Sequence, residues 1–194
     1  GLADGYFIIA YTIGDYLANN KLEKITTNHP AFEEAYNTAK ARNEKLLSIK
    51  GKRSADDFHK ALGKIMWDYV GMSRNEEGLK FAIAEIKKLQ TEFWQDLNVP
   101  GESADINLEL EKANRVYDFL ELGELMAQDA LARRESCGGH FREESQTPEN
   151  EALRDDEKFA HAALWMFEGE GKEPTRYQEE LKFENVPLSQ RSYK

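Results

Sequence analysis

The chain has 194 residues, of which 40% are hydrophobic and 32% charged, with a formal net charge of −10 and one cysteine. This charge disfavours nucleic acid and anionic lipid surfaces as partners, and one cysteine excludes an internal disulfide and fits a reducing compartment. The longest apolar run, residues 6–13, is far shorter than the roughly 20 residues of a membrane-spanning helix. These totals favour a helical domain with a packed core and a charged surface.

The N-terminal part of the chain predicts two helices joined by a polar connector. Apolar residues recur at helical spacing over residues 2–18, and the connector covers residues 21–29. The second helix begins at Pro30 and runs to about Lys50, with Asn28 or His29 as its N-terminal cap.

Three further amphipathic patterns predict the main helices. The first covers residues 55–70 after a capping box at Ser54-Ala-Asp-Asp57, and the second runs from the cap Asn75 to about Leu97. The third covers residues 103–134, with Asp105 or Asn107 as its cap. Short connections between such helices predict an antiparallel three-helix bundle, like a spectrin repeat. The residues expected in its core are Leu62, Ile65, Ile83, Ile86, Leu120 and Met126, with Trp67, Trp94 and Trp165 as core aromatics.

After the third helix the pattern changes from helical to extended. Gly138-Gly139 is expected to stop that helix, which would place Arg133 and Arg134 in its last turn. Residues 159–167 and 177–183 flank a cluster of turn residues and predict a β-hairpin, followed by an extended tail. The predicted fold is therefore mainly α, a three-helix bundle with an extra N-terminal helix and a C-terminal β-hairpin segment. The predicted domains are residues 1–20, 21–142 and 143–194.

Cys137 and His140 have the spacing of metal ligands, and Asp155, Asp156 and His161 follow them. One cysteine is too few for a typical zinc site, and a Cys–His nucleophile would need an orienting third group. We therefore predict no catalytic residue and no metal ligand. The chain also lacks the Gly-x-Gly-x-x-Gly fingerprint, so we predict no cofactor-binding residue within it.

Three ordered motifs carry a resemblance to a known family. Residues 134–142 read Arg-Glu-Ser-Cys-Gly-Gly-His-Phe-Arg and are followed by Leu153-Arg-Asp-Asp-Glu157. With Met66-Trp-Asp-Tyr-Val-Gly-Met-Ser-Arg74 and the closing Gln190-Arg-Ser-Tyr-Lys194, they resemble the C-terminal domain of succinate dehydrogenase and fumarate reductase flavoproteins. Cys137 and Gly139 depart from this pattern, since many members have Arg and Ala there.

The resemblance implies a parent oxidoreductase that interconverts succinate and fumarate through covalently bound FAD. It implies as partners the flavin-binding and capping domains of the same subunit, an iron–sulfur subunit and a membrane anchor subunit, but no nucleic acid. It also implies a cytoplasmic location, peripheral to the inner membrane through partner subunits. Residues 1–20 would then be the end of a flavin-binding domain that is otherwise missing. The chain by itself is expected to be inactive and to hold no FAD.

The densest cluster of mixed charges coincides with the strongest motif. We interpret it as a domain-contact surface, because Arg side chains pair readily with carboxylates and carbonyls of a neighbour. The alternative is that these residues tie the third helix to residues 154–156 within the chain. At the level of function, the alternatives are an L-aspartate oxidase-like flavoprotein and a free-standing helical interaction module. The predicted contact residues are Arg134, Glu135, Ser136, Gly138, Gly139, His140, Arg142, Arg154, Asp155 and Asp156.

Overall fold

The computed structural model describes residues 1–102, 106–169 and 171–189, which divide into two compact units, residues 1–42 and 43–194. The first unit is helical. Its N-terminal helix consists of η1 (Asp4–Ile8), α1 (Ile9–Tyr11) and η2 (Thr12–Leu17), and η1 and η2 have π-helical hydrogen bonding. The helix α2 (Pro30–Ser48) begins in this unit, and Nδ1 of His29 accepts a hydrogen bond from the Ala31 N–H at 3.2 Å. His29 is thus the N-terminal cap of α2.

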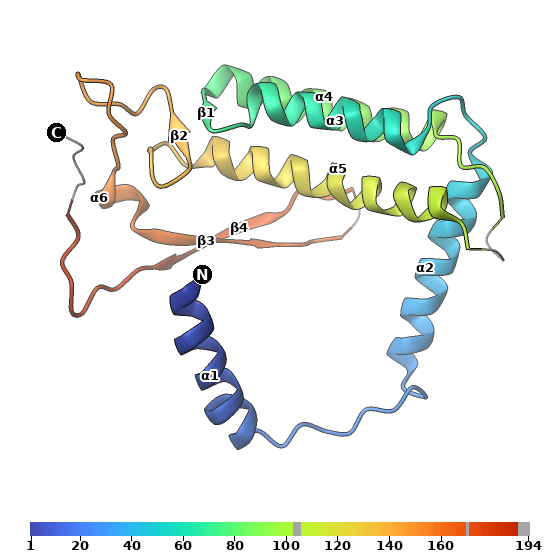
Figure 1. The fold of residues 1–194 in the computed structure, drawn as a ribbon, viewed down its shortest axis with the longest axis horizontal. Helices are drawn as coiled ribbons and strands as arrows, with labels where there is room; N and C mark the ends of the chain where they lie inside the picture. The colour runs from blue at the N-terminus through green and yellow to red at the C-terminus, as the bar shows by residue number, and fades with distance from the viewer. Residues whose placement is uncertain (103–105, 170, 190–194) are drawn as a thin grey trace. The chain divides into compact units, whose positions relative to one another are not determined.

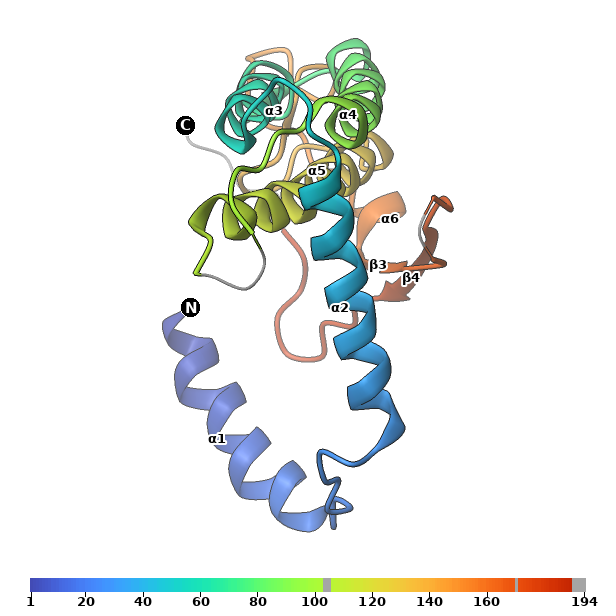
Figure 2. The same cartoon turned by 90° about the vertical axis from the view of Figure 1, so that its right-hand side faces the viewer.

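The second unit is built around three helices, α3 (Ala55–Tyr69), α4 (Glu76–Asp96) and α5 (Leu108–Ala132). They run in alternating directions, with α3 and α4 side by side and α5 packed against both (Figures 1 and 2). Their apolar faces meet in two clusters of buried residues, a larger one that includes Phe58, Phe93 and Val116 and a smaller one that includes Leu79 and Ala127. The predicted mainly α fold with an antiparallel three-helix bundle is confirmed.

Each bundle helix begins at a side chain that accepts hydrogen bonds from its first turn. Ser54 and Asp57 form the predicted capping box of α3, with the Asp57 N–H donating to Ser54 Oγ at 3.2 Å. Asn75 caps α4 and Asn107 caps α5, as predicted. The alternative cap Asp105 lies outside the described residues.

The core prediction is confirmed for the residues that lie on the inward faces of the three helices. Leu120 is 2% exposed, and Leu62 and Ile86 are also buried. Met126 and Trp67 are exposed, so their predicted burial is wrong. At about 100° per residue, Met126 lies roughly 120° around α5 from Leu120, which turns its side chain away from the partner helices. Ile65, Ile83 and Trp94 are half-buried and pack against the core clusters, and Trp165, which lies outside the bundle, is also half-buried.

A two-stranded hairpin follows the bundle, as predicted. β3 (His161–Met166) pairs in antiparallel register with β4 (Thr175–Glu180), after the short helix α6 (Asp156–Phe159). The hairpin is fixed to the bundle through Trp165, whose Nε1 donates to Oδ1 of Asp129 at 2.8 Å. Among the described helices, none combines the length and the apolar character needed to cross a bilayer.

The core position of Leu120 gives a direct test of this packing. We expect Leu120→Ala to lower the free energy of unfolding by about 2–5 kcal/mol, because the truncation leaves a cavity between three helices. The matched control is Leu122→Ala on the same helix, where the side chain is 53% exposed and the change should stay within about 0.5 kcal/mol. Urea unfolding measures both. If the two variants lose the same free energy of unfolding, a different face of α5 packs against the other helices.

Candidate functional site

The elbow, which we define as residues 134–142, lies against the loop between α3 and α4. Here β1 (Ser73–Arg74) and β2 (Phe141–Arg142) pair in parallel, with Arg74 opposite Arg142. The backbone pairing extends one residue beyond β2, because the Glu143 N–H donates to the Arg74 carbonyl at 2.8 Å. Two of the sequence motifs, residues 66–74 and 134–142, are therefore hydrogen-bonded neighbours.

Arg142 is the buried centre of the elbow, with a relative exposure of 2%. Its Nη1 donates to the carbonyls of Ala130 at 3.0 Å and Leu131 at 3.2 Å, and its Nε donates to Oε2 of Glu144 at 3.0 Å. The last carbonyls of a helix lack helical partners, and the helix dipole favours a cation there. Arg142 therefore caps the C-terminus of α5.

This arrangement corrects the predicted end of the third helix. The helix α5 ends at Ala132, and Arg133 already has an extended conformation. Arg133 and Arg134 are therefore not in its last turn, and the glycine pair does not stop it. Gly138 instead has a positive φ of 59°, within a tight turn closed by reciprocal backbone hydrogen bonds between Cys137 and His140.

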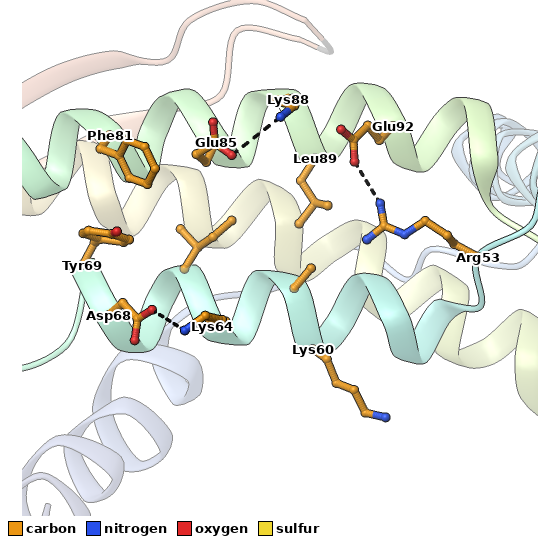
Figure 3. Close-up of a pocket in the computed structure, with 12 residues that line it drawn as sticks. Arg53, Lys60, Lys64, Asp68, Tyr69, Phe81, Glu85, Lys88, Leu89 and Glu92 are labelled. Atoms are coloured by element: carbon orange, nitrogen blue, oxygen red, sulfur yellow. Dashed lines mark hydrogen bonds and ion pairs between the residues drawn. The ribbon is translucent and has the colours of Figure 1, made fainter.

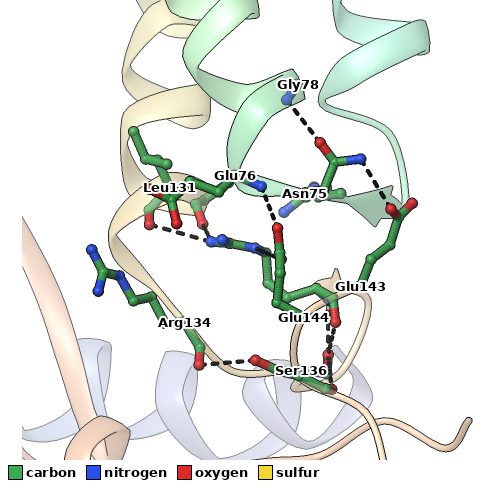
Figure 4. Close-up of polar contacts among 12 residues, drawn as sticks. Asn75, Glu76, Gly78, Leu131, Arg134, Ser136, Glu143 and Glu144 are labelled. Carbon is green, nitrogen blue, oxygen red and sulfur yellow. Dashed lines mark hydrogen bonds and ion pairs between the residues drawn. The ribbon is translucent and has the colours of Figure 1, made fainter.

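Two carboxylates next to Arg142 bind the start of α4 (Figure 4). Oε1 of Glu144 accepts from the Glu76 N–H at 2.6 Å, and Oε2 of Glu143 accepts from Nδ2 of the cap Asn75 at 2.9 Å. Partial burial raises the pKa of Glu144, but backbone amides and the Arg142 guanidinium outweigh it and hold that pKa below its ordinary value. Glu144 therefore stays ionised between a helix N-terminus and a buried cation, both of which favour its charge.

Glu135 and Ser136 are buried and join the elbow to the segment after it. Oε1 of Glu135 pairs with Nη1 of Arg133 at 2.6 Å, and its Oε2 accepts from the Asp155 N–H at 2.9 Å. Oγ of Ser136 accepts from the Arg142 N–H at 2.8 Å, and the Ser136 N–H donates to the Leu153 carbonyl at 2.9 Å. The segment 153–155, which follows the elbow in the same motif, thus belongs to the same network.

His140 bridges the ends of two helices. Its Nε2 lies 2.9 Å from the Arg133 carbonyl and its Nδ1 lies 2.7 Å from Nη1 of Arg74. Because a guanidinium only donates, Nδ1 accepts and Nε2 carries the hydrogen. Burial is the main cause that lowers the pKa of His140, and the charges of Arg74, Arg142 and Arg133 lower it further, against the opposing bond to the Arg133 carbonyl.

The remaining predicted residues lie at the exposed edge of this network. Arg134, Gly138 and Gly139 are exposed, and in Figure 4 the Arg134 guanidinium points away from Ser136. Arg134 also lines a pocket of about 380 Å³ together with Glu144, Leu153 and residues 154–157. Arg154 is held by Asp156, with Nη2 at 2.7 Å from Oδ2, and Asp155 caps α6 by accepting from the Lys158 N–H at 3.2 Å.

The network also contains residues that were not predicted as site residues, namely Arg74, Arg133, Glu143 and Glu144. Arg74 stood within the second motif, and its Nε donates to the Gly71 carbonyl at 2.6 Å near the end of α3. Its pairing with His140, 66 residues away, had no signal in the sequence.

The site offers structural ties rather than reactive groups. Among the described residues, no three His, Cys, Asp or Glu side chains gather as a metal site requires. Both ring nitrogens of His140 are engaged by Arg133 and Arg74, so neither is available as a base for the exposed Cys137. The glycines of the elbow lead into a turn and not into a helix N-terminus, so the elbow does not fit the phosphates of FAD.

Comparison with known proteins identifies this architecture. Residues 59–193 match the family described as the C-terminal part of the fumarate reductase flavoprotein. The chain belongs to this family. The matched residues include most of the bundle, the elbow and the hairpin, and the family resemblance carried by the three motifs is confirmed.

Individual relatives of the fumarate reductase flavoprotein family agree. A fumarate reductase flavoprotein subunit of Helicobacter pylori is 30% identical over 179 residues, covering 91% of this chain and 24% of the relative. The solved structure of quinol fumarate reductase from E. coli matches with a TM-score of 0.72 at 23% identity, over 86% of this chain and 27% of that one. An L-aspartate oxidase of Synechocystis is 29% identical over 94 residues, covering 42% of this chain and 17% of the relative. The chain spans about a quarter of the length of the fumarate reductase subunits that it matches.

The lowered pKa of His140 predicts a pH dependence of stability. The unfolded chain binds a proton on this histidine at its ordinary pKa of about 6.5, whereas the folded elbow resists that proton. The stabilisation is thus fully present above this pH and is lost as the pH falls. We expect the free energy of unfolding to decline more steeply between about pH 7.5 and 5.5 in the native chain than in a His140→Gln variant. Urea unfolding at several pH values measures this, and identical slopes would contradict the assignment.

Proposed function

We propose that this chain is the C-terminal helical domain of an FAD-dependent oxidoreductase that interconverts succinate and fumarate. The observation that carries the proposal is the 30% identity to a fumarate reductase flavoprotein subunit across 91% of the chain. In this proposal the flavin-binding and capping domains of the same subunit hold FAD and the substrate. Residues 1–20 form the end of that flavin-binding domain, residues 21–142 the helical bundle and residues 143–194 the extended segment with the hairpin. The bundle supports the flavin-binding domain from outside and contributes no reactive group.

We further propose that the elbow, with residues 154–156, contacts those domains. Its buried members, Glu135, Ser136 and Arg142, hold the backbone in place, and its exposed members meet the neighbour. Arg134 suits this role because its exposed guanidinium forms no hydrogen bond or ion pair with the described residues, while its carbonyl is fixed by Ser145 Oγ at 3.1 Å. An exposed planar guanidinium on a fixed backbone suits recognition of a carboxylate or a carbonyl of another domain.

The partners that we propose beyond this subunit are an iron–sulfur subunit and a membrane anchor subunit. The support is that the fumarate reductase relatives of this chain are named as subunits. A cytoplasmic location, peripheral to the inner membrane through those partners, belongs to the same proposal.

A second candidate is an L-aspartate oxidase-like flavoprotein. The match to the Synechocystis enzyme over 94 residues favours it, although that match covers less than half of the chain. The two candidates differ in substrate, and the same purified protein distinguishes them.

The test uses the full-length protein that contains this chain. We expect it to carry stoichiometric flavin and to reduce fumarate with a reduced viologen dye as electron donor, and to show no oxidation of L-aspartate. The 194-residue chain alone should show no flavin absorbance. Oxidation of L-aspartate without fumarate reduction would favour the second candidate, and flavin retained by the isolated chain would contradict the division of roles.

The contact role of the elbow is tested by Arg134→Ala in the same protein. The expected result is weaker flavin retention and lower fumarate reduction, with an unchanged melting temperature of the 194-residue chain, because this guanidinium forms no hydrogen bond or ion pair with the residues that the structure describes. The matched control is Arg115→Ala, which removes an exposed arginine of α5 that pairs with Glu111. If Arg134→Ala lowers flavin retention no more than Arg115→Ala does, the contact proposal fails.

A further inference from the structure

The junction between the elbow and the loop that joins α3 to α4 holds a neutral imidazole among positive charges. Nδ1 of His140 accepts from Nη1 of Arg74 at 2.7 Å, and its Nε2 donates to the Arg133 carbonyl at 2.9 Å. The charged groups that face the ring are Arg74 from β1, Arg133 from the segment after α5 and Arg142 from β2. Among the described residues, no carboxylate forms a hydrogen bond or ion pair with the ring. These contacts therefore require the neutral ring.

A proton taken from water by Nδ1 of His140 would break the bond to Arg74. A protonated Nδ1 carries a hydrogen and cannot accept, so the imidazolium and the guanidinium would meet as two donors and two cations. At the 2.7 Å that separates these nitrogens the contact cannot persist, and the two side chains must separate. Arg74 keeps acceptors at the end of α3, because its Nε donates to the carbonyls of Val70 at 3.2 Å and Gly71 at 2.6 Å. Arg74 would therefore stay with α3, and the His140 ring would move away.

The elbow turn, which we define as residues 137–141, is otherwise joined weakly to that loop. Apart from the bond of His140, the hydrogen bond that links the turn to the loop among the described residues runs from the Phe141 N–H to the Met72 carbonyl, at 3.2 Å. Beyond the turn the chain stays attached to α4, because Glu144 keeps its pKa below the ordinary value and accepts from the Glu76 N–H at 2.6 Å. Opening would thus be confined to the elbow turn.

The bundle does not depend on this histidine. The rings of Tyr69 and Phe81 pack between α3 and α4 with their centroids 4.8 Å apart (Figure 3). Arg53, just before α3, pairs with Glu92 of α4 at 2.8 Å in the same view. Neither contact includes a histidine, and the buried residues of both core clusters are apolar. The three helices should therefore remain packed when the elbow turn opens.

We propose that His140 is an acid-sensitive latch, which holds the elbow turn against the loop between α3 and α4 when neutral and releases it when protonated. In the closed turn, burial and the three arginine charges hold the pKa of His140 below its ordinary value, against the opposing bond to the Arg133 carbonyl. An open turn in water restores the ordinary pKa of about 6.5. The open turn therefore binds the proton more tightly, and its population rises as the pH falls below about 6.5. A consequence for the domain contact of Gly138 and Gly139 rests on the proposed function, but the latch itself does not.

The test is amide hydrogen exchange of the 194-residue chain, followed by NMR, with each rate divided by that of an unstructured peptide at the same pH. We expect the protection of the Phe141 N–H to fall about three- to tenfold between about pH 7.5 and 5.5. Because the opening is local, about 1 M urea should leave this protection unchanged. The same urea should lower the protection of the Leu120 N–H, which exchanges through global unfolding. If the protection of Phe141 is constant with pH, or if urea lowers it as steeply as that of Leu120, the proposal is wrong.

Two variants assign the effect to the ring of His140. The amide of His140→Gln can accept from Arg74 and donate to the Arg133 carbonyl but cannot bind a proton, so the protection of Phe141 should not change with pH. The matched control is His161→Gln, because Nε2 of His161 also lies close to an arginine, 3.0 Å from Nη2 of Arg176, but in the hairpin. This control should keep the native fall in protection. A fall that persists in His140→Gln, or one that is lost in His161→Gln, would contradict the latch.

Nitrogen NMR of the His140 ring in the native chain needs no variant and serves if His140→Gln does not fold. The ring should be the Nε2–H tautomer at neutral pH and should titrate with a midpoint below its ordinary pKa of about 6.5. The Nδ1–H tautomer, or a midpoint at or above that pH, would overturn the proposal. None of these outcomes depends on flavin content or fumarate reduction, so the latch and the proposed function can fail separately.

Discussion

The structure depends on one buried cation at the point where helix ends meet. The Arg142 guanidinium binds the last carbonyls of α5 and the Glu144 carboxylate, and Glu144 in turn binds the first amide of α4. Removing a charge from water is costly, and a buried ion pair stabilises a protein only when its geometry supplies further hydrogen bonds. The Arg142 guanidinium meets that condition, because two helix carbonyls and a carboxylate accept hydrogen bonds from it. Arg142 thus compensates the negative C-terminal end of the α5 dipole, and Glu144 compensates the positive N-terminal end of the α4 dipole.

This constraint explains why the elbow can present other residues at a surface. The paired strands β1 and β2 are only two residues long, too short to hold a loop by themselves. Side chains supply the rest, since Arg74 and His140 join the end of α3 to the elbow, and Glu135 joins the elbow to Asp155. The exposed Arg134 therefore projects from a backbone that is fixed on both sides. A rigid base of this kind lowers the entropy cost of binding a neighbouring domain, which supports the proposed contact role.

The sequence was sufficient wherever the determining interactions are local. The caps Ser54, Asn75 and Asn107 lie within three residues of the amides that they bind, and the hairpin follows from its turn and its extended pattern. The three motifs also led to the correct family. The contact role of the ten predicted residues stays a prediction.

The predictions from sequence failed where the structure depends on contacts between residues that are far apart in the chain. The end of α5 was assigned to the glycine pair, but a side chain ten residues beyond Ala132 ends it. The bond between Arg74 and His140 joins positions 66 residues apart, and no local pattern records it. Met126 was placed on the same side of its helix as Leu120, and Trp67 was expected in the core because it is a large aromatic residue, but both side chains are exposed.

The most direct measurement is the free energy of unfolding of Arg142→Lys, compared with that of Arg134→Lys in the same chain. Lysine keeps the charge but lacks the planar fork, so it cannot reach the helix carbonyls and Glu144 together. A loss of about 1–3 kcal/mol is predicted for Arg142→Lys, and no more than about 0.5 kcal/mol for the exposed Arg134→Lys. If Arg142→Lys is as stable as the native chain, the buried guanidinium does not hold the helix ends together, and the account of the elbow is wrong.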